Sequence, residues 1–340
     1  MPNASGNDEE IRMTFTALQV TEPSQGRFQM DLVQRTLDEL PAGEVLIRVR
    51  YSSLNFKDAL SASGNRGVTR SYPHTPGIDA AGVVEQSSVA EFSAGDEVIV
   101  TGYDLGMNTA GGFGQYIRVP AVWVIKRPRE LSLRESMILG TAGLTAALCV
   151  DKLEQAGLAP DAGPVLVTGA TGGVGSIAVA LLARLGYAVT AVTGKADRAG
   201  FLRSLGATEV IDRQGLQAGG ERPLLKEQWA GAVDTVGGDI LFNAVKGLRR
   251  GGSLACCGLT AGTEFQGNVL PFILRGVNLL GVDSVEIPLV VKASMWDKLS
   301  VQWKIDLSAL VREVSLGELA GEIERILQGQ QVGRVLVDLG

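Results

Sequence analysis

The sequence predicts an α/β protein in which a doubly wound parallel sheet is combined with a separate β-rich domain. Three observations support this prediction. A short apolar strand, a glycine-dense turn at residues 169–175 and a helix follow one another in the second half of the chain. Strands and helices then alternate up to residue 282, whereas the first 127 residues contain short strands joined by segments rich in Gly, Pro and Ser. The chain has 340 residues, which is enough for two domains with sizeable cores.

The composition fits an α/β protein with many tight turns: 45% hydrophobic residues, 44 glycines and a formal net charge of −6. The acidic balance argues against nucleic acid or an anionic membrane as a general partner. We find no uncharged apolar run of membrane-spanning length and no signal-peptide pattern at the start, and therefore expect a cytoplasmic protein. The three cysteines, Cys149, Cys256 and Cys257, form no C-x-x-C motif and are expected to be reduced thiols.

Residues 1–12 are polar and patternless, so we expect a disordered N-terminal extension. Beyond them, runs of alternating or β-branched residues predict strands at 14–20, 44–51, 82–85, 96–100 and 115–119. Short strands at this spacing indicate a partly open β-barrel rather than βαβ units. The predicted domains are 13–127 together with 291–340 for the β-rich domain, and 128–290 for the α/β domain.

The α/β part opens with Ser132 and Glu135, which have the spacing of a capping box at the start of a helix. A second helical run covers residues 145–154, and a third, at 177–185, ends at Gly186. Predicted strands lie at 165–168, 188–193, 208–212, 231–236, 253–257 and 277–282. Six strands with intervening helices make a complete Rossmann sheet, and a closing strand at 334–339 is expected to return to the β-rich domain.

The glycine-dense turn opens directly onto a helix N-terminus, where free backbone amides and the helix dipole favour a phosphate group. Gly172, Gly173 and Gly175 keep side chains away from that position. The strict G-x-G-x-x-G pattern is not met, because Ala170 stands at the first glycine position. A tight turn between strand and helix is the alternative, but the strand and helix around the turn favour dinucleotide binding.

The end of the second Rossmann strand indicates which dinucleotide binds. An NAD site has Asp or Glu there to hold the ribose 2′-hydroxyl, whereas this chain has Thr193, Gly194 and Lys195, with Arg198 one turn later. A hydroxyl and two cations suit a 2′-phosphate, which a carboxylate would repel. The sequence therefore predicts NADP(H) in preference to NAD(H), with an ordinary solvated helix start as the alternative interpretation of the two cations.

Several motifs together resemble one protein family. They lie at residues 53–58 (Ser-Leu-Asn-Phe-Lys-Asp), 76–82 (Pro-Gly-Ile-Asp-Ala-Ala-Gly), 140–146, 229–237, 271–275 and 281–285. With these motifs the chain after Met13 resembles the medium-chain dehydrogenase/reductases, in which a GroES-like catalytic domain precedes the cofactor domain. Within that family it is similar to the quinone oxidoreductase-like YhdH/YhfP subgroup of acryloyl-CoA reductases.

Zinc-dependent members of this family take metal ligands from Cys, His and an acidic residue. Here Asn55 stands near the first ligand position, and residues 77–79 (Gly-Ile-Asp) replace a Gly-His-Glu motif. No cysteine precedes Cys149, and the single histidine, His74, is expected to be a loop residue rather than a ligand or a catalytic base. We therefore expect no zinc.

The resemblance also implies site residues. It places Asn55 at the cleft as a hydrogen-bond donor to nicotinamide or substrate, and Tyr72 as a proton donor or enolate partner, with simple aromatic packing as the alternative for Tyr72. Lys57 and Asp58 are expected to form an exposed ion pair. Tyr103 and Asp104 are further candidates at the edge of the cleft. For the cofactor, the residues implied are Phe56, Thr141, Thr145, Thr171, Val174 and Leu259.

Without a metal to stabilise an alkoxide, these groups favour reduction of a C=C bond that is conjugated to a carbonyl. Three interpretations stay open: an NADPH-dependent reductase of acryloyl-CoA or a similar short enoyl thioester, a reductase of quinones or small enones and enals, and an NADPH-binding protein without turnover. An acyl-CoA would require cations at the cleft, for which Arg66, Arg70 and Arg275 are candidates. The apolar sixth strand is a sheet edge and predicts a homodimer.

Overall fold

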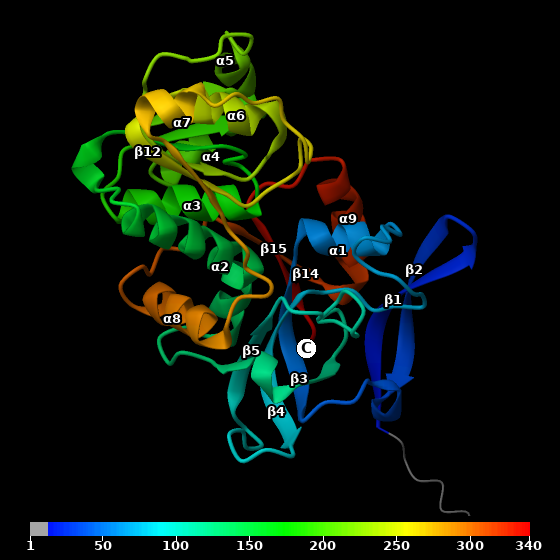
Figure 1. Cartoon of the computed structure of the whole chain (residues 1–340). Helices are drawn as coiled ribbons and strands as arrows, with labels where there is room; N and C mark the ends of the chain where they lie inside the picture. Colours follow the sequence, from blue (N-terminus) through cyan, green and yellow to red (C-terminus); the bar gives the residue numbers. More distant parts are fainter. Residues whose placement is uncertain (1–12) are drawn as a thin grey trace, which may run out of the picture.

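A β-rich part and an α/β part share one long helix, α2 (Leu133–Gln155), in the computed structural model of the chain (Figure 1). The structure describes residues 13–340, so the extension predicted at residues 1–12 lies outside the described residues. Helix α2 contacts strands of both parts, because its apolar residues face the two sheets. It has the length and hydropathy of a membrane-spanning segment, yet 89% of its apolar window is buried inside the protein, as in a core helix.

The β-rich part has a seven-stranded sheet with the order β14-β15-β3-β4-β5-β7, in which β6 also pairs with β3. Its strands are β3 (Val45–Leu54), β4 (Asp79–Ser87), β5 (Glu97–Thr101), β6 (Tyr116–Val119), β7 (Val124–Lys126), β14 (Val311–Ser315) and β15 (Arg334–Asp338). A separate hairpin is made by β1 (Thr14–Ser24) and β2 (Arg27–Thr36). Two short helices, α1 (Phe56–Ala62) and α9 (Leu319–Leu327), pack on each other beside this sheet. The five strands predicted in the first 127 residues are confirmed, and the closing strand joins this sheet as expected.

The α/β part is a parallel six-stranded sheet with the order β10-β9-β8-β11-β12-β13, which confirms the predicted Rossmann sheet. Its strands are β8 (Val165–Val167), β9 (Val189–Thr193), β10 (Glu209–Asp212), β11 (Trp229–Asp234), β12 (Leu248–Cys256) and β13 (Asn278–Gly281). The helices between them are α3 (Gly173–Arg184), α4 (Ala199–Ser204), α5 (Arg213–Gln217), α6 (Gly238–Lys246) and α7 (Leu270–Arg275). The strand order reverses between β8 and β11, and a ligand crevice is expected there, at the carboxyl ends of the strands.

Helix α2 starts as the capping box predicts: Glu135 N donates to Ser132 Oγ (3.1 Å), and Ser132 N donates to the Glu135 carboxylate (2.8 Å). It breaks at Gly140, whose backbone has φ 51° and ψ −155°. This left-handed region favours glycine, and a Cβ there would overlap Ser53 Oγ and lie 2.5 Å from Asp79 Oδ2. The break therefore lets α2 pass directly over the polar residues of β3 and β4.

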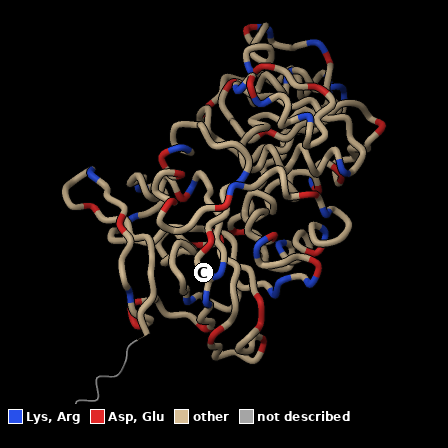
Figure 2. Tube along the Cα trace, turned by 180° about the vertical axis from the view of Figure 1, so that it is seen from behind, with Lys and Arg blue, Asp and Glu red and all other residues tan. Residues whose placement is uncertain are grey.

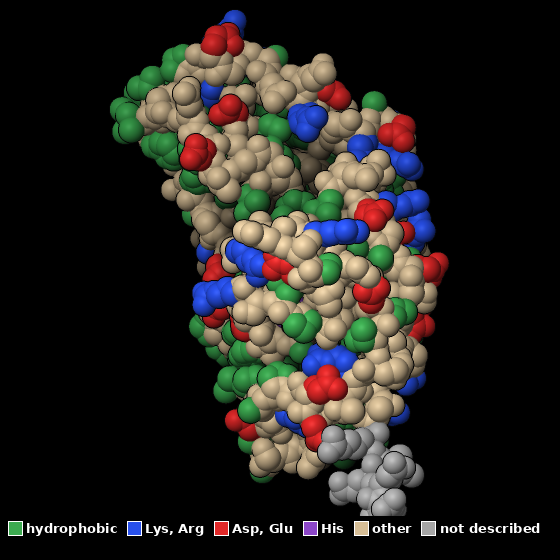
Figure 3. All heavy atoms as spheres, turned by 90° about the vertical axis from the view of Figure 1, so that its right-hand side faces the viewer, with side chains coloured by type: hydrophobic (Ala, Val, Ile, Leu, Met, Phe, Trp, Pro, Cys, Tyr) green, Lys and Arg blue, Asp and Glu red, His purple; other side chains and the backbone are tan. Residues whose placement is uncertain are grey.

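Helix α8 (Leu289–Ser300) packs on α2, and its buried Met295, Trp296 and Leu299 belong to the same apolar core as α2 and α3. The boundary near residue 290 thus runs through a continuous core, and its position stays a prediction. Lys and Arg residues are interspersed with Asp and Glu residues along both parts of the chain (Figure 2). Seen from the side, the surface is hollowed between the α/β part and the β-rich part (Figure 3).

Candidate active site

The glycine-dense turn connects β8 to the first residue of α3 in one tight loop. Gly169 has a φ of 58°, and a Cβ on Gly175 would overlap the Gly169 carbonyl oxygen, so the loop can cross over itself only with glycine at both positions. Ala170 replaces the first glycine of the usual pattern without strain, because it is buried and its amide donates to Val192 O (3.0 Å). The predicted turn residues Thr171, Gly172, Gly173, Val174 and Gly175 all lie in this loop or in the first turn of α3.

A group of cations lies at the ends of β9 and β10, beside this loop. Thr193 Oγ1 accepts a hydrogen bond from Lys195 N (3.0 Å), and burial, together with nearby Arg198, lowers the pKa of Lys195. Arg198 itself pairs with Asp197 at 3.0 Å. Arg213, the first residue after β10, brings its guanidinium so near Gly194 that a Cβ there would lie 3.4 Å from Cζ. Arg213 therefore joins the cations that the sequence analysis had identified.

At the other end of the crevice, one buried carboxylate organises the polar residues. Asp79 is 0% exposed and accepts four hydrogen bonds: from Ser53 Oγ (2.6 Å), Asn55 Nδ2 (2.7 Å), Thr141 N (2.9 Å) and Thr141 Oγ1 (2.5 Å). These residues come from β3, the start of α1 and the break in α2, so three elements meet at Asp79. We call Asp79, Ser53, Asn55 and Thr141 the Asp79 network.

Arg334, at the start of β15, connects this network to the backbone around it. It is 1% exposed and donates from Nε to Ile138 O (2.9 Å) and from Nη1 to Leu54 O (3.2 Å) and Asn55 Oδ1 (3.2 Å). Asn55 is thus held through both ends of its amide, by a carboxylate on one side and a guanidinium on the other. Two charged partners thus restrict the orientation of this side chain.

The same guanidinium also faces the glycine turn. Among the described residues Arg334 Nη2 has no hydrogen-bond partner although it is buried. A Cβ on Gly140 would lie 3.0 Å from Nη2, and a Cβ on Gly173 would lie 2.9 Å from Nη1. A buried cation with an unused donor, next to the N-terminus of the twelve-residue helix α3, fits an anionic group such as a pyrophosphate. The cofactor predicted from the sequence therefore fits this site.

The ion pair predicted for Lys57 and Asp58 is wrong. Asp58 is 0% exposed, and its carboxylate accepts hydrogen bonds from Asn55 N and Ile78 N, both at 2.8 Å. Burial and the nearby Asp79 raise the pKa of Asp58 to about 7. The reason for the error is that Asp58 lies on the side of α1 that faces β4, where the sequence shows only a polar helix start.

The predicted residues on the nicotinamide side lie on three different elements. Phe56 is the half-buried first residue of α1, and Leu259 follows β12 with 50% of its side chain exposed. Thr145 is buried, and its hydroxyl is hydrogen-bonded to Thr141 O (2.7 Å) and Ser284 Oγ (2.8 Å). Whether these residues contact a cofactor stays a prediction.

Tyr72 lies at the opposite end of α1 from Asn55. Its hydroxyl donates to Ser61 O in the last turn of that helix, and its ring packs on Phe28, with centroids 4.9 Å apart, and under the Arg66 guanidinium. Burial raises the pKa of Tyr72. The structure therefore brings Asn55 and Thr141 together but sets Tyr72 apart from them, and a catalytic role for Tyr72 stays a prediction.

Tyr103, another candidate from the sequence, holds the two parts together. Its amide donates to Val285 O and its hydroxyl to Ile287 O, both at 3.2 Å. The fully buried Lys292 lies 3.4 Å from the centre of the Tyr103 ring. The neighbouring candidate Asp104 accepts hydrogen bonds within its own loop, from Asn108 and Thr109.

His74 is a buried loop residue, as predicted: its Nε2 lies 2.9 Å from Gly106 O, and burial lowers its pKa. Within residues 13–340 no group of three or more His, Cys, Asp or Glu side chains comes together to hold a metal ion. Asn55 and Asp79, which the sequence resemblance matched to zinc-ligand motifs, are hydrogen-bonded to each other.

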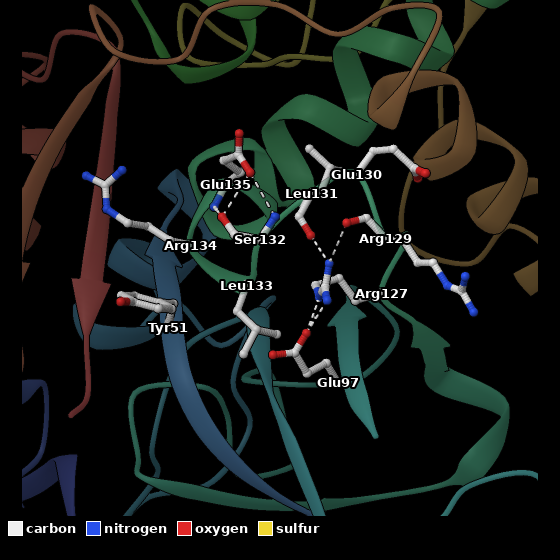
Figure 4. Close-up of a pocket in the computed structure, with 10 residues that line it drawn as sticks. All are labelled: Tyr51, Glu97, Arg127, Arg129, Glu130, Leu131, Ser132, Leu133, Arg134 and Glu135. Carbon is white, nitrogen blue, oxygen red and sulfur yellow. Dashed lines mark hydrogen bonds and ion pairs between the residues drawn. The ribbon is translucent and has the colours of Figure 1, made fainter. Parts of the chain in front are cut away.

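A surface hollow of about 480 Å³ lies at the start of α2 (Figure 4). Arg127 at its centre pairs with Glu97 and also donates to the carbonyls of Pro128 and Leu131. Arg134, another lining residue, pairs with Glu313 outside the hollow, and the hollow shares no residue with the Asp79 network. We therefore place the candidate site in the crevice between the two parts.

Two family models match the chain: the alcohol dehydrogenase GroES-like domain at residues 41–129 and the zinc-binding dehydrogenase model at residues 173–300. The chain is 49% identical, over 304 residues that cover 89% of it and 92% of the relative, to the putative quinone oxidoreductase YhfP of Bacillus subtilis (strain 168). It is 45% identical, over 96% of its length and 99% of the relative, to the acrylyl-CoA reductase AcuI of Ruegeria pomeroyi. The chain belongs to the medium-chain dehydrogenase/reductase family.

Solved structures of other medium-chain dehydrogenase/reductases have the same fold over nearly the whole chain. The YhdH oxidoreductase of Salmonella enterica, in complex with NADP, matches with a TM-score of 0.93 and 42% identity, covering 96% of this chain and all of that one. The YhfP protein of Bacillus subtilis with NAD bound matches with a TM-score of 0.93, 47% identity and the same coverage. The family and the GroES-like domain followed by a Rossmann domain, both expected from the sequence motifs, are confirmed.

The sequence analysis did not identify three residues as members of the candidate site: Asp79, Arg213 and Arg334. Asp79 had been considered only as a substitute in a metal-ligand motif. Arg213 carries a usable signal, because a cation directly after the third Rossmann strand lies beside the end of the second one. Arg334 carries none, because 279 residues separate it from Asn55.

Proposed function

We propose that the chain is an NADPH-dependent reductase of an activated C=C bond, with acryloyl-CoA or a similar short enoyl thioester as the substrate. The observation that supports this most directly is the crevice itself: a glycine turn with cations beside it at one end, and the hydrogen-bonded Asp79 network at the other. The relative from Ruegeria pomeroyi, an acrylyl-CoA reductase by name, supports the choice of substrate.

The residues that would hold the cofactor divide into three groups. For the pyrophosphate they are Thr171, Gly172, Gly173, Val174, Gly175 and Arg334. For the adenosine 2′-phosphate they are Thr193, Gly194, Lys195, Arg198 and Arg213. For the nicotinamide they are Phe56, Thr141, Thr145 and Leu259. NADPH, when bound, supplies the hydride that the β-carbon of the substrate receives.

Within this proposal Asn55 orients the substrate. Its Nδ2 donates strongly to Asp79 (2.7 Å) and only weakly to Ser53 O (3.3 Å), so the second hydrogen is the one that is free to serve a ligand. We assign that hydrogen to the carbonyl oxygen of the thioester, on which negative charge develops during reduction. Arg334 and Asp79 contribute by keeping the amide in this orientation.

Two groups other than Asn55 can carry a proton at neutral pH: Asp58, which lies near Asp79, and Tyr72, which lies at the far end of α1. Asp58 does so because burial and Asp79 raise its pKa to about 7, and Tyr72 because burial raises its already high pKa.

Replacement of Asn55 by Ala and of Tyr72 by Phe tests the assignment of the catalytic residues. We expect both variants to lose turnover, and normal turnover in both would show that the residues are wrongly assigned.

Reduction of a quinone or small enone is the second candidate. In its favour, two of the three arginines considered for the phosphates of an acyl-CoA already have other partners. Arg275 donates to the carbonyls of Leu225, Lys246 and Leu248 and is thereby a structural residue. Arg66 pairs with Glu22. The relative YhfP is named a putative quinone oxidoreductase, and a quinone needs no phosphate-binding cation.

NADPH oxidation with acryloyl-CoA, compared with a simple quinone and with NADH as the alternative cofactor, distinguishes the candidates. We expect fast turnover of acryloyl-CoA with NADPH. Turnover of the quinone with an inactive thioester would support the second candidate. Inactivity with both substrates despite NADPH binding would contradict the proposed reaction.

We expect Arg213 and Lys195 to determine the preference for NADPH. Removing either cation by substitution with Met deletes one charge-assisted hydrogen bond to the 2′-phosphate, so the Kd for NADPH should rise about 10- to 100-fold. The Kd for NADH, which lacks the phosphate, should change little. Titration of cofactor fluorescence measures both constants. Arg198→Met should have the smaller effect because Asp197 already neutralises that guanidinium, and a larger effect there than at Arg213 would contradict the assignment.

We also propose a cytoplasmic homodimer that forms through β13. This strand is one of the two edges of the Rossmann sheet, with half-exposed Leu279 and Leu280, and the exposed Ile273 and Leu274 of α7 precede it in the chain. Light scattering at micromolar concentration should give the mass of a dimer, and Leu280→Lys should give a monomer. Leu32→Lys, on the exposed strand β2, serves as the control and should stay dimeric. A monomeric wild-type protein would contradict the proposal.

A further inference from the structure

The short segment at residues 331–334, which leads into β15 and includes its first residue, contacts the α/β part at two points. Lys195 Nζ donates to Gln331 O (2.5 Å), and Gly333 N donates to Thr171 O in the glycine turn (2.9 Å). A segment that leads into the β-rich sheet is thereby attached to the cation group and to the phosphate-binding turn at once.

The last residue of the same segment, Arg334, holds the catalytic end of the crevice. Its guanidinium donates to Asn55 Oδ1 and to Leu54 O, both at 3.2 Å. Four consecutive residues thus connect the ammonium group of Lys195 with the side-chain amide of Asn55.

The segment is stiff enough to transmit a constraint. Gln331 Nε2 donates to Gly333 O (3.1 Å), and Arg334 N donates to Leu310 O (2.7 Å). Gly333 has a φ of 64°, and a Cβ there would overlap the Leu310 carbonyl oxygen. The backbone of Gly333 is therefore packed closely against Leu310, and hydrogen bonds hold both ends of the short path from Gln331 to Arg334.

We propose that the 331–334 segment couples recognition of the cofactor 2′-phosphate to the position of Asn55, with Lys195 as the positioning residue. An ammonium group has three donors, and the Gln331 carbonyl uses one of them. A 2′-phosphate on the remaining donors would immobilise Lys195 and, through the carbonyl, the segment and the Arg334 guanidinium. The phosphate would then raise kcat as well as affinity, since the orientation of Asn55 is sharpened. This inference rests on the proposed NADPH-dependent function.

Hydrogen exchange tests the coupling without any substrate. We expect adenosine 2′,5′-bisphosphate, which carries the 2′-phosphate but no nicotinamide, to slow exchange of the Gly333 and Arg334 amides about fivefold or more. Adenosine 5′-diphosphate, which lacks the 2′-phosphate, should not slow it. Lys195→Met should abolish the difference at saturating ligand, and Gln330→Ala, an exposed neighbour outside the segment, should preserve it. Equal exchange with the two nucleotides in the wild-type protein would overturn the coupling.

A kinetic measurement separates coupling from affinity. Gln331→Ala removes the hydrogen bond that stiffens the segment but leaves the cations in place. We expect it to bind adenosine 2′,5′-bisphosphate within about twofold of wild type and to lose most of the kcat advantage of NADPH over NADH. An unchanged kcat ratio would overturn the proposal. Failure of the wild-type protein to bind the bisphosphate would instead contradict the cofactor assignment itself, so the two failures are distinguishable.

Discussion

Replacement of Arg334 by Met should lower the free energy of unfolding by about 3–5 kcal/mol at pH 8. The guanidinium is buried near the carboxylates of Asp79 and Asp58, and its loss removes a buried counter-charge from both. The Asn55 amide would lose its partner at Oδ1, and the pyrophosphate its donor, so the affinity for NADPH should fall as well. Urea denaturation measures the stability.

The loss of stability in the Arg334→Met variant should depend on pH, and Asp58 determines whether it grows or shrinks as the pH rises. Asp58 has a raised pKa of about 7 in the folded protein, so its contribution to stability is present below its ordinary value of 3.8 and lost as the pH rises through 7. Without the positive charge of Arg334, the ionised form of Asp58 is disfavoured further in the folded protein. The Arg334→Met variant should therefore lose less stability at pH 5 than at pH 8. Equal losses at the two pH values would contradict this account, and Arg312→Met, at an exposed guanidinium paired with Glu322, serves as the control.

Replacement of Asp79 by Ala should lower kcat/KM by about 100-fold or more. This carboxylate accepts four hydrogen bonds, and its removal releases Asn55 and Thr141, the two network residues that reach the crevice. Arg334 would also stay buried without its nearest anion. Steady-state kinetics with NADPH and the thioester, together with cofactor titration, measure the effect, which should appear mainly in kcat.

A conservative variant tests whether Asp79 acts through these hydrogen bonds. In Asp79→Asn the amide oxygen can keep the three donors that now point to Oδ2, and the amide nitrogen can donate to Thr141 Oγ1. We therefore expect Asp79→Asn to retain more activity than Asp79→Ala. If the Asn variant is as inactive as the Ala variant, the charge rather than the hydrogen bonds is decisive. Asp31→Asn, at an exposed carboxylate of β2, serves as the control.

The Rossmann sheet was predictable because its signals are local. Most of its strands contain a short apolar run, and the glycine turn defines the first βαβ unit without reference to the rest of the chain. Strands β2, β7 and β14 were not predicted. Strand β2 (Arg27–Thr36) has mostly exposed or half-exposed side chains, and β7 (Val124–Lys126) has only three residues, so neither produces a clear apolar pattern.

The candidate site was predictable only in part, for a topological reason. Thr193, Lys195 and the glycines lie within one βαβ unit, so their proximity follows from local structure. Arg334 reaches Asn55 because β15 pairs antiparallel with β3, which sets Val335 opposite Leu54. A pairing between strands so distant in the chain leaves no trace in either strand alone. The burial of Asp58 also depends on residues distant in the chain, since its carboxylate accepts a hydrogen bond from Ile78 N, just before β4.

The measurement that tests the central claim most directly is product analysis after turnover of acryloyl-CoA with NADPH that carries deuterium at the transferable position of the nicotinamide. The account predicts propanoyl-CoA that is one mass unit heavier, with the deuterium on C3, because hydride adds to the carbon that is conjugated to the thioester carbonyl. Unchanged acryloyl-CoA, despite tight NADPH binding and rapid reduction of a quinone, would contradict it.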